Sequence, residues 1–160
     1  LAEKGGYWCD TDMVCLQPFR GDVPYVFSSQ HVNRRGGRTM MINNGVMLAP
    51  QGCAMINWCY ETAASRDPGS LKWGETGPRL VDRAVVQFGL AEYVAPPREF
   101  CPINWWEWDQ CITREYREDW LTGSRGVHLW NEMWRRNGVE KEDVFAPDCL
   151  YSQLRQRFLN

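Results

Sequence analysis

The most informative stretch of this chain is Gly5-Gly6-Tyr7-Trp8-Cys9-Asp10-Thr11-Asp12-Met13-Val14-Cys15-Leu16. Two glycines precede two short apolar runs, which predict strands over residues 6–9 and 13–16. Two aspartates interrupt the runs. Because unpaired carboxylates are costly to bury, the pair requires a counter-charge, and Mg²⁺ or Mn²⁺ prefers carboxylate oxygen. Residues i and i+2 of a strand face one side, so Asp10 and Asp12 can share one ion.

The spacing of the two aspartates is by itself a weak signal. Nine aspartates in 160 residues give about 0.5 Asp-x-Asp pairs by chance. The alternative interpretation is a solvated turn, but such turns usually lie among polar residues. Here Tyr-Trp-Cys precedes the pair and Met-Val-Cys-Leu follows it. The apolar flanks therefore favour a metal site.

The remaining hydrophobic pattern predicts one α/β domain over residues 1–160. Strands are expected over 23–27, 39–42, 46–49 and from 126 onward, helices over 53–64, from 78 and over 148–158, and a loop over 30–38. Asn43-Asn44-Gly45 interrupts one apolar stretch, and paired Asn before Gly commonly forms a tight turn. Pro78 suits the first position of a helix. The preceding Glu75-Thr76-Gly77 would then lie at a helix N-terminus, which favours anions or serves as an ordinary cap.

Charge composition bears on the kind of ligand. The formal net charge is -2, so no global basic field indicates nucleic-acid binding. The basic residues comprise 15 arginines and 3 lysines, and arginine suits bidentate recognition of phosphate. Arg34, Arg35 and Arg38 gather in the expected loop. They would contact a donor phosphate or an anionic acceptor, or they simply mark a solvated hairpin loop.

Aromatic and histidine residues suggest a sugar site. Three tryptophans cluster over residues 105–108, and sugars stack their C–H faces on aromatic rings. Trp105 and Trp108 are candidates for such a wall, although core packing is the alternative for any single tryptophan. A lone histidine such as His128 is usually a satisfied polar group. Beside two aspartates it is also the natural third ligand of a hard cation.

The seven cysteines give information on the cellular compartment of the protein. None forms Cys-x-x-Cys, which argues against zinc. Their odd number and apolar surroundings predict buried free thiols and weakly favour a reducing compartment. No run approaches the ~20 apolar residues of a membrane span. A cytoplasmic location, at or near an inner membrane face, is expected, or a Golgi lumen in a eukaryote. Membrane association is expected only through other segments or through the acceptor.

Four sets of motifs in order resemble the DXD-containing glycosyltransferase family 32, which includes α-1,4-glycosyltransferases and polysaccharide mannosyltransferases. They are Gly-Gly-Tyr-Trp-Cys-Asp-Thr-Asp with Gln17-Pro18-Phe19, Asn43-Asn44-Gly45-Val46-Met47-Leu48-Ala49, Trp73-Gly74-Glu75-Thr76-Gly77-Pro78 with Leu80, and finally Phe100-Cys101-Pro102-Ile103-Asn104-Trp105 with His128-Leu129-Trp130-Asn131. The resemblance covers nearly the whole chain. It implies a GT-A-type fold and a retaining, metal-dependent transfer of sugar, in polysaccharide or glycolipid synthesis.

This resemblance also implies ligands and roles. Mn²⁺ or Mg²⁺ would be held by Asp10, Asp12 and His128, the donor would be a UDP- or GDP-sugar, and the acceptor a glycan or glycolipid. Catalytic candidates are Asp10, Asp12, Asn44 and Glu75; substrate-binding candidates are Gly6, Asn43, Thr76, Gly77, Trp105, Trp108, Trp130 and Asn131. Thr76 stands where relatives often carry an amide, which leaves the sugar specificity open. Residues 1–6 resemble the last turn of a helix with a glycine cap. The resemblance therefore suggests the C-terminal portion of a catalytic domain that lacks its N-terminal nucleotide-binding strands.

Three rival interpretations remain. A carbohydrate-binding or degenerate transferase domain would use the tryptophans without catalysis. A metal-dependent phosphohydrolase also uses Asp-x-Asp, but it needs lysine partners, and Lys4, Lys72 and Lys141 lie in no matching context. A fragment could also be inactive when alone. The paired aspartates together with His128 favour the transferase.

Overall fold

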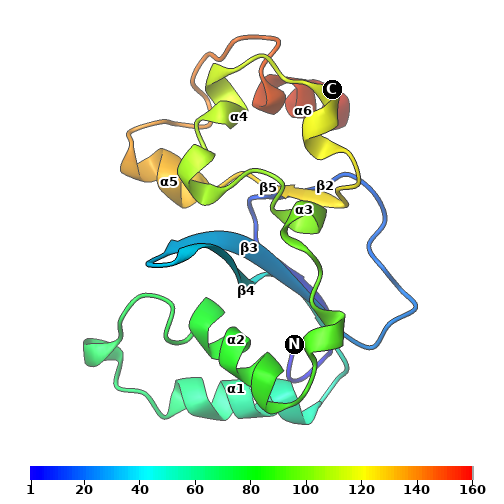
Figure 1. The fold of residues 1–160 in the computed structure, drawn as a ribbon, viewed down its shortest axis with the longest axis vertical. Coiled ribbons are helices and arrows are strands. Elements are labelled where there is room, and N and C mark those ends of the chain that lie inside the picture. Colours follow the sequence, from blue (N-terminus) through cyan, green and yellow to red (C-terminus); the bar gives the residue numbers. More distant parts are fainter. Residues whose placement is uncertain (160) are drawn as a thin grey trace.

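A three-stranded antiparallel sheet lies in the middle of the molecule (Figure 1). The computed structural model describes residues 1–159. The strand order is β1 (Gly6–Cys9), β4 (Gly37–Ala49) and β3 (Val26–Arg34). Helices α1 (Ala54–Ala64) and α2 (Pro78–Gln87) cover one face of this sheet.

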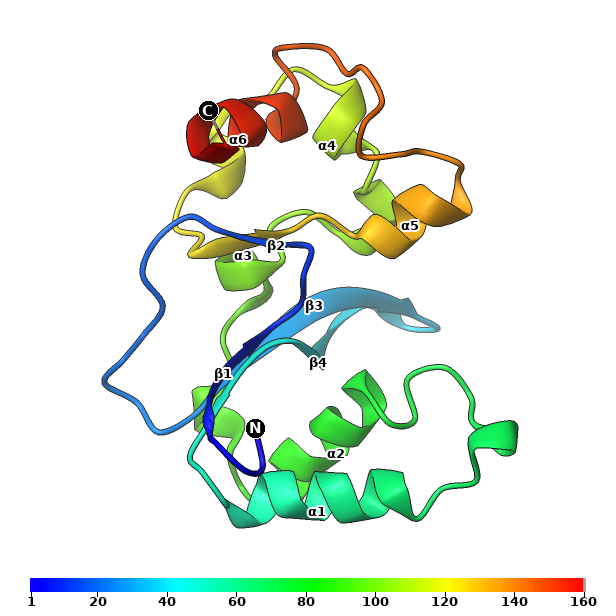
Figure 2. The same cartoon turned by 180° about the vertical axis from the view of Figure 1, so that it is seen from behind.

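A second, two-stranded antiparallel ribbon lies beyond the other face, as both views show (Figures 1 and 2). It pairs β2 (Met13–Cys15) with β5 (Gly126–His128). Short helices surround the ribbon: α3 (Pro97–Phe100), α4 (Gln110–Thr113), α5 (Asn131–Arg136) and α6 (Leu150–Leu159). Single 3₁₀ turns complete the chain: η1 (Pro68–Ser70), η2 (Ala91–Tyr93), η3 (Trp105–Glu107) and η4 (Glu118–Leu121). The fold is therefore mixed α/β.

Three apolar clusters hold these layers together. The first joins Phe27 and Ile42 of the sheet to the stripe of α2 that contains Val81 and Val85. The second surrounds the fully buried Trp134 and ties the ribbon to α4 and α6. The third lies between the sheet and α3. Because Val46 of β4 and Met13 of β2 both pack in the third cluster, the sheet and the ribbon are fixed relative to each other.

Most predicted elements are confirmed. The strands at 6–9 and 13–15, the helices α1, α2 and α6, and the strand that ends at His128 lie where the pattern placed them. The chain also begins with one turn closed by Gly5 N–H donating to Leu1 O at 2.7 Å. The seven cysteines are free as predicted; Cys101, Cys111 and Cys149 are buried, whereas Cys9 and Cys15 are exposed, contrary to the prediction of buried thiols. No helix in residues 1–159 is both long and apolar enough to cross a bilayer.

The predicted loop over 30–38 is wrong. Strand β3 begins at Val26, later than expected, and continues to Arg34, while β4 starts at Gly37, so that Arg35 and Gly36 alone form the turn. Gly37 has a φ of 114°, which a glycine accommodates readily. The residues at this end of the hairpin are polar because both faces of the strands are exposed to solvent there. Such strands lack the alternation of apolar and polar residues by which a strand is recognised in a sequence.

A tight turn at Asn43-Asn44-Gly45 is wrong as well. Strand β4 passes through these residues without reversing. The pairing shifts between Phe27, opposite Met47, and Ser29, opposite Ile42, so the segment forms a bulge against Ser28. Bulges re-aim side chains at functional sites, and this one lies at the edge of the cavity described below.

Two neighbouring valines on α2 test the packing of the first cluster. Val85 is 0% exposed and Val86 is 73% exposed. We expect Val85→Ala to lower the free energy of unfolding by about 2 kcal/mol, because two buried methyl groups leave a cavity. Val86→Ala should stay within ~0.5 kcal/mol of the parent. Urea unfolding followed by circular dichroism measures both, and equal losses would contradict the assigned face of α2.

Candidate metal and substrate site

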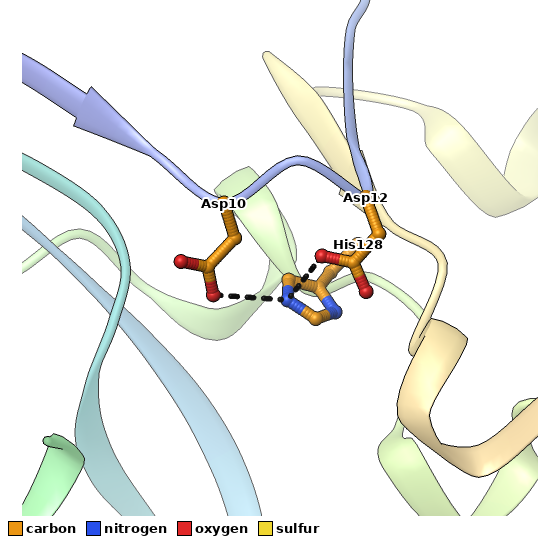
Figure 3. A group of neighbouring side chains, drawn as sticks. All are labelled: Asp10, Asp12 and His128. Carbon is orange, nitrogen blue, oxygen red and sulfur yellow. Dashed lines mark ion pairs between the residues drawn. The ribbon is translucent and has the colours of Figure 1, made fainter. Parts of the chain in front are cut away.

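Two carboxylates and one imidazole converge between the sheet and the ribbon (Figure 3). Asp10 follows the last residue of β1, Asp12 precedes β2, and His128 ends β5. The β2–β5 pairing places His128 opposite Met13, beside Asp12. Backbone pairing thus joins the two distant segments of the chain that form the group.

The geometry suits a divalent cation. His128 Nε2 lies 3.6 Å from Asp10 Oδ2 and 3.5 Å from Asp12 Oδ1. One ligand atom from each residue lies within 4.8 Å of the other two. His128 is buried and both aspartates are partly buried. Two carboxylates with one neutral imidazole form a donor set for Mg²⁺ or Mn²⁺.

Backbone contacts hold Asp12 in place. Its carbonyl oxygen accepts from Leu129 N at 3.0 Å, and its Oδ2 accepts from Asn131 N at 2.9 Å. These bonds bracket Trp130, the only non-glycine residue with a left-handed backbone among residues 1–159, at φ 58°. Such a conformation costs about 1–3 kcal/mol and clusters at functional sites. Here it turns the chain so that both N–H groups reach Asp12.

The imidazole of His128 is oriented from both sides. The Trp130 N–H points at Nδ1 at 3.2 Å, so Nδ1 accepts and the neutral ring carries its proton on Nε2, toward the carboxylates. The Trp130 ring packs 4.0 Å from the imidazole, centroid to centroid. Coordination through Nε2 would move the proton to Nδ1, opposite the Trp130 N–H. The carboxylates therefore fit a cation as they stand, whereas coordination through Nε2 requires the imidazole to turn Nδ1 away from the Trp130 N–H.

The bulge of β4 is fixed by a buried polar network around Asn43. Asn43 Oδ1 accepts from the Ser28 hydroxyl and from Gly45 N at 3.0 Å. Its amide donates to Gln30 Oε1 at 2.9 Å and toward Cys101 Sγ at 3.6 Å. Burial raises the pKa of the Cys101 thiol to about 12, so the sulfur stays neutral. Both polar side-chain atoms of Asn43 thus have partners.

Gly45 connects this network to the carboxylates. Its carbonyl oxygen accepts from Asp10 N at 2.8 Å. A β-carbon at Gly45 would lie 3.3 Å from Asn43 Oδ1 and 3.3 Å from His128 Cδ2. Asp10 Oδ2 would lie 3.7 Å away. Glycine is required here for close approach rather than for an unusual backbone angle.

A cavity of about 760 Å³ opens above the group. Its lining includes nine of the predicted site residues: Asp10, Asp12, Asn43, Asn44, Thr76, Gly77, Trp105, His128 and Trp130. The side chain of Asn44 has no hydrogen-bond partner within residues 1–159 and is free for a ligand. The cavity thus combines polar groups at its base with indole rings in its walls.

Four predicted site residues do not line the cavity. Gly6 pairs with Ala49 in the sheet, and Trp108 packs on Trp134 in the second cluster. Glu75 closes a local turn by accepting from Lys72 N at 3.1 Å. Asn131 contributes its backbone N–H to Asp12 rather than a cavity-lining side chain.

At the expected anion site at the start of α2, most backbone N–H groups already have acceptors within the chain. Gly77 N–H and Arg79 N–H both donate to Gly74 O, and Leu80 N–H donates to Gly77 O. Pro78 has no N–H. The N-terminus of α2 therefore shapes the cavity wall through Thr76 and Gly77 rather than presenting N–H groups to an anion.

Sequence reasoning missed eight residues that line the cavity: Gln30, Gly45, Trp73, Gly74, Pro78, Glu132, Met133 and Arg136. Hydrogen bonds from Arg135 and Arg136 lower the pKa of Glu132 to about 2, so this carboxylate is charged. Arg136 brings one guanidinium to the cavity. Helical spacing after the His128 motif could have identified Glu132, Met133 and Arg136 as one face of a helix.

Known proteins are similar to this sequence. The family described as "Alpha 1,4-glycosyltransferase conserved region" matches residues 69–158. The chain is 27% identical to lactosylceramide 4-alpha-galactosyltransferase of Pongo pygmaeus, over 96% of this chain and 71% of that sequence. It is 27% identical to the Homo sapiens protein of that name, over 96% and 44% of the two chains, and 25% identical to the Rattus norvegicus one, over 99% and 44%.

The chain spans less than half the length of the human and rat relatives. No solved structure matches it. The family match covers more than half of the chain, which therefore belongs to the alpha 1,4-glycosyltransferase family.

The two adjacent asparagines of the bulge should behave differently. Asn43→Ala removes the partners of several buried polar groups, so we expect the free energy of unfolding to fall by about 3 kcal/mol. Asn44→Ala removes a side chain that faces the cavity, so stability should change by less than ~0.5 kcal/mol. Chemical denaturation of both variants measures this, and equal stability of the two would contradict the network.

Proposed function

We propose that this member of the alpha 1,4-glycosyltransferase family moves a sugar, with retention, from a nucleotide-diphosphate donor to a hydroxyl of a glycan or glycolipid. The observation that carries the proposal is the convergence of Asp10, Asp12 and His128 at the base of a cavity with indole walls. The mixed α/β fold and the paired aspartates fit a GT-A-type enzyme.

The acidic group suits the charge of the donor. A nucleotide diphosphate repels bare carboxylates, so Asp10 and Asp12 serve a donor only together with a cation. Mn²⁺ or Mg²⁺ held there by Asp10, Asp12 and His128 would neutralise the diphosphate as the nucleotide departs. Trp8 Nε1 donates to Asp10 Oδ1 at 3.0 Å, and Asn131 N donates to Asp12 Oδ2. One oxygen of each carboxylate is therefore held while the other faces His128.

Arg136 is placed to contact the same diphosphate. Its Nε donates to Glu132 Oε1 at 2.9 Å. The remaining guanidinium N–H groups are available to phosphate oxygens, which arginine binds in a bidentate manner. Glu132 thereby orients the guanidinium, and the charged pair lines one wall of the cavity.

Asn44 and the indoles would hold the sugars. The free amide of Asn44 can donate to and accept from sugar hydroxyls. The exposed fraction of Trp105 is 38%, so its ring offers a face for stacking. In a front-face reaction the departing phosphate accepts the proton of the acceptor hydroxyl. That route needs no protein nucleophile, and neither aspartate has to leave its place.

The names of the relatives indicate their substrates. They describe transfer of a galactosyl group to lactosylceramide. We extend to this chain only the class, namely a hexosyl donor and a lipid-linked sugar acceptor, with UDP and GDP both open as the nucleotide. The rival interpretation is a carbohydrate-binding domain without catalysis. A domain that only binds carbohydrate would not require paired carboxylates beside His128 and Arg136.

Substitution of Asp12 tests the proposal. Asp12→Asn keeps an oxygen that accepts from Asn131 N–H and removes the charge, so the fold should persist. We expect sugar transfer to fall at least about 100-fold, because the diphosphate loses its cation. Asp22→Asn, at an exposed position outside the cavity, is the matched control. Radiolabelled transfer from UDP- and GDP-sugars in Mn²⁺ measures it, and undiminished turnover of Asp12→Asn would contradict the assignment.

Gly45 gives a second test through the supporting structure. In Gly45→Ala the new methyl group presses on His128 and Asn43, so we expect Mn²⁺ affinity to fall about tenfold. Gly21→Ala is the control, because no heavy atom lies within 4 Å of its added β-carbon. Calorimetric titration of Mn²⁺ into each variant measures the affinity. Identical Mn²⁺ binding by the two variants would show that the bulge does not support the site.

A further inference from the structure

The arginines of the β3–β4 hairpin have no role in the cavity. Arg34, Arg35 and Arg38 are exposed, and none of them lines the cavity or joins an ion pair within residues 1–159. No acidic residue occurs from residue 23 to residue 60. The tip of the hairpin thus carries positive charges that no acidic side chain within residues 1–159 neutralises.

A second projection carries apolar side chains. Leu71, Lys72 and Trp73 follow η1 in the loop before α2, where Leu71 is 39% exposed and Trp73 is 69% exposed. Figures 1 and 2 show the hairpin tip and this loop extending on the same side of the molecule as α5. Tryptophan and basic side chains together are typical of a membrane interface.

Both projections border the mouth of the cavity. The Arg38 guanidinium lies 5.6 Å from the Trp106 ring, whose centroid lies 5.6 Å from that of Trp105. Trp105 and Trp73 line the same cavity. A surface that engaged the hairpin and the loop at once would therefore face the opening through which an acceptor enters.

We propose that Arg34, Arg35, Arg38, Leu71, Lys72 and Trp73 form a docking surface for an anionic lipid membrane. Basic groups would approach the lipid headgroups, while Leu71 and Trp73 enter the interface. A soluble polyanion would satisfy the arginines and leave both apolar side chains in water, so the mixture favours a bilayer. The inference rests on the proposed function in one respect: a cavity whose opening is held at the membrane would receive a lipid-linked sugar acceptor.

Vesicle co-sedimentation of the purified 160-residue chain tests the surface. Phosphatidylcholine vesicles with phosphatidylserine are compared with phosphatidylcholine alone, without donor or metal. We expect binding to the anionic vesicles that weakens with salt. The triple variant Arg34→Gln, Arg35→Gln, Arg38→Gln should lose roughly 100-fold of that affinity, since each basic residue near the surface contributes about fivefold. Trp73→Ala should weaken binding several-fold.

The matched control removes the same charge elsewhere. Arg114, Arg155 and Arg157 are exposed near α4 and α6, away from the hairpin (Figure 1), and their triple glutamine variant should bind like the parent. Absence of vesicle binding, or equal loss in both triple variants, would overturn the proposal. Heparin binding through the hairpin arginines, with vesicle binding indifferent to Trp73→Ala, would overturn it in favour of a polyanionic glycan. Because neither donor nor metal is present, the vesicle assay gives its result independently of whether the chain transfers sugar.

Discussion

The antiparallel pairing of β2 with β5 is the contact on which the site depends. Asp12 and Asn131 lie 119 positions apart in the sequence, yet they are joined by a backbone N–H and a carboxylate oxygen. The same pairing places His128 beside Asp12. Without the ribbon, Asp10 and Asp12 would be two like charges at the end of an edge strand. The apolar cluster around Trp134 matters to the chemistry because it holds β5 against the rest of the structure.

Two departures from regular geometry complete the site. The left-handed backbone at Trp130 and the bulge at residues 43–46 each bring backbone groups to one of the two aspartates. Trp130 directs two N–H groups to Asp12, and Gly45 offers its carbonyl to Asp10 N. Regular strands would leave these groups in the ladder. The strain is stabilised by packing of the Trp130 ring on His128 and by its indole N–H, which donates to Ile103 O at 2.9 Å.

The parts of the site that could be predicted are those with a local signature. Carboxylates in an apolar run stand out because they are costly to bury there, and His128 ends a short apolar strand of its own. The helical stripe of α2 and the proline at its start are local signals too. The part of the β3–β4 hairpin over 30–38 could not be predicted in this way, because exposed polar strands lack an apolar period. Gln30 and Arg136 reach the cavity only through tertiary packing, and Glu75, a predicted catalytic residue, closes a local turn outside the cavity lining.

Nucleotide binding shows whether the group of Asp10, Asp12 and His128 holds a cation for a nucleotide-sugar donor. UDP and GDP are titrated separately into the purified protein by calorimetry, with Mn²⁺ and with the metal chelated. If Asp10, Asp12 and His128 hold a cation for a sugar nucleotide, one nucleotide binds with Mn²⁺ and its affinity collapses without the metal. Silence toward both nucleotides in Mn²⁺, or binding that is the same with and without it, would contradict the account.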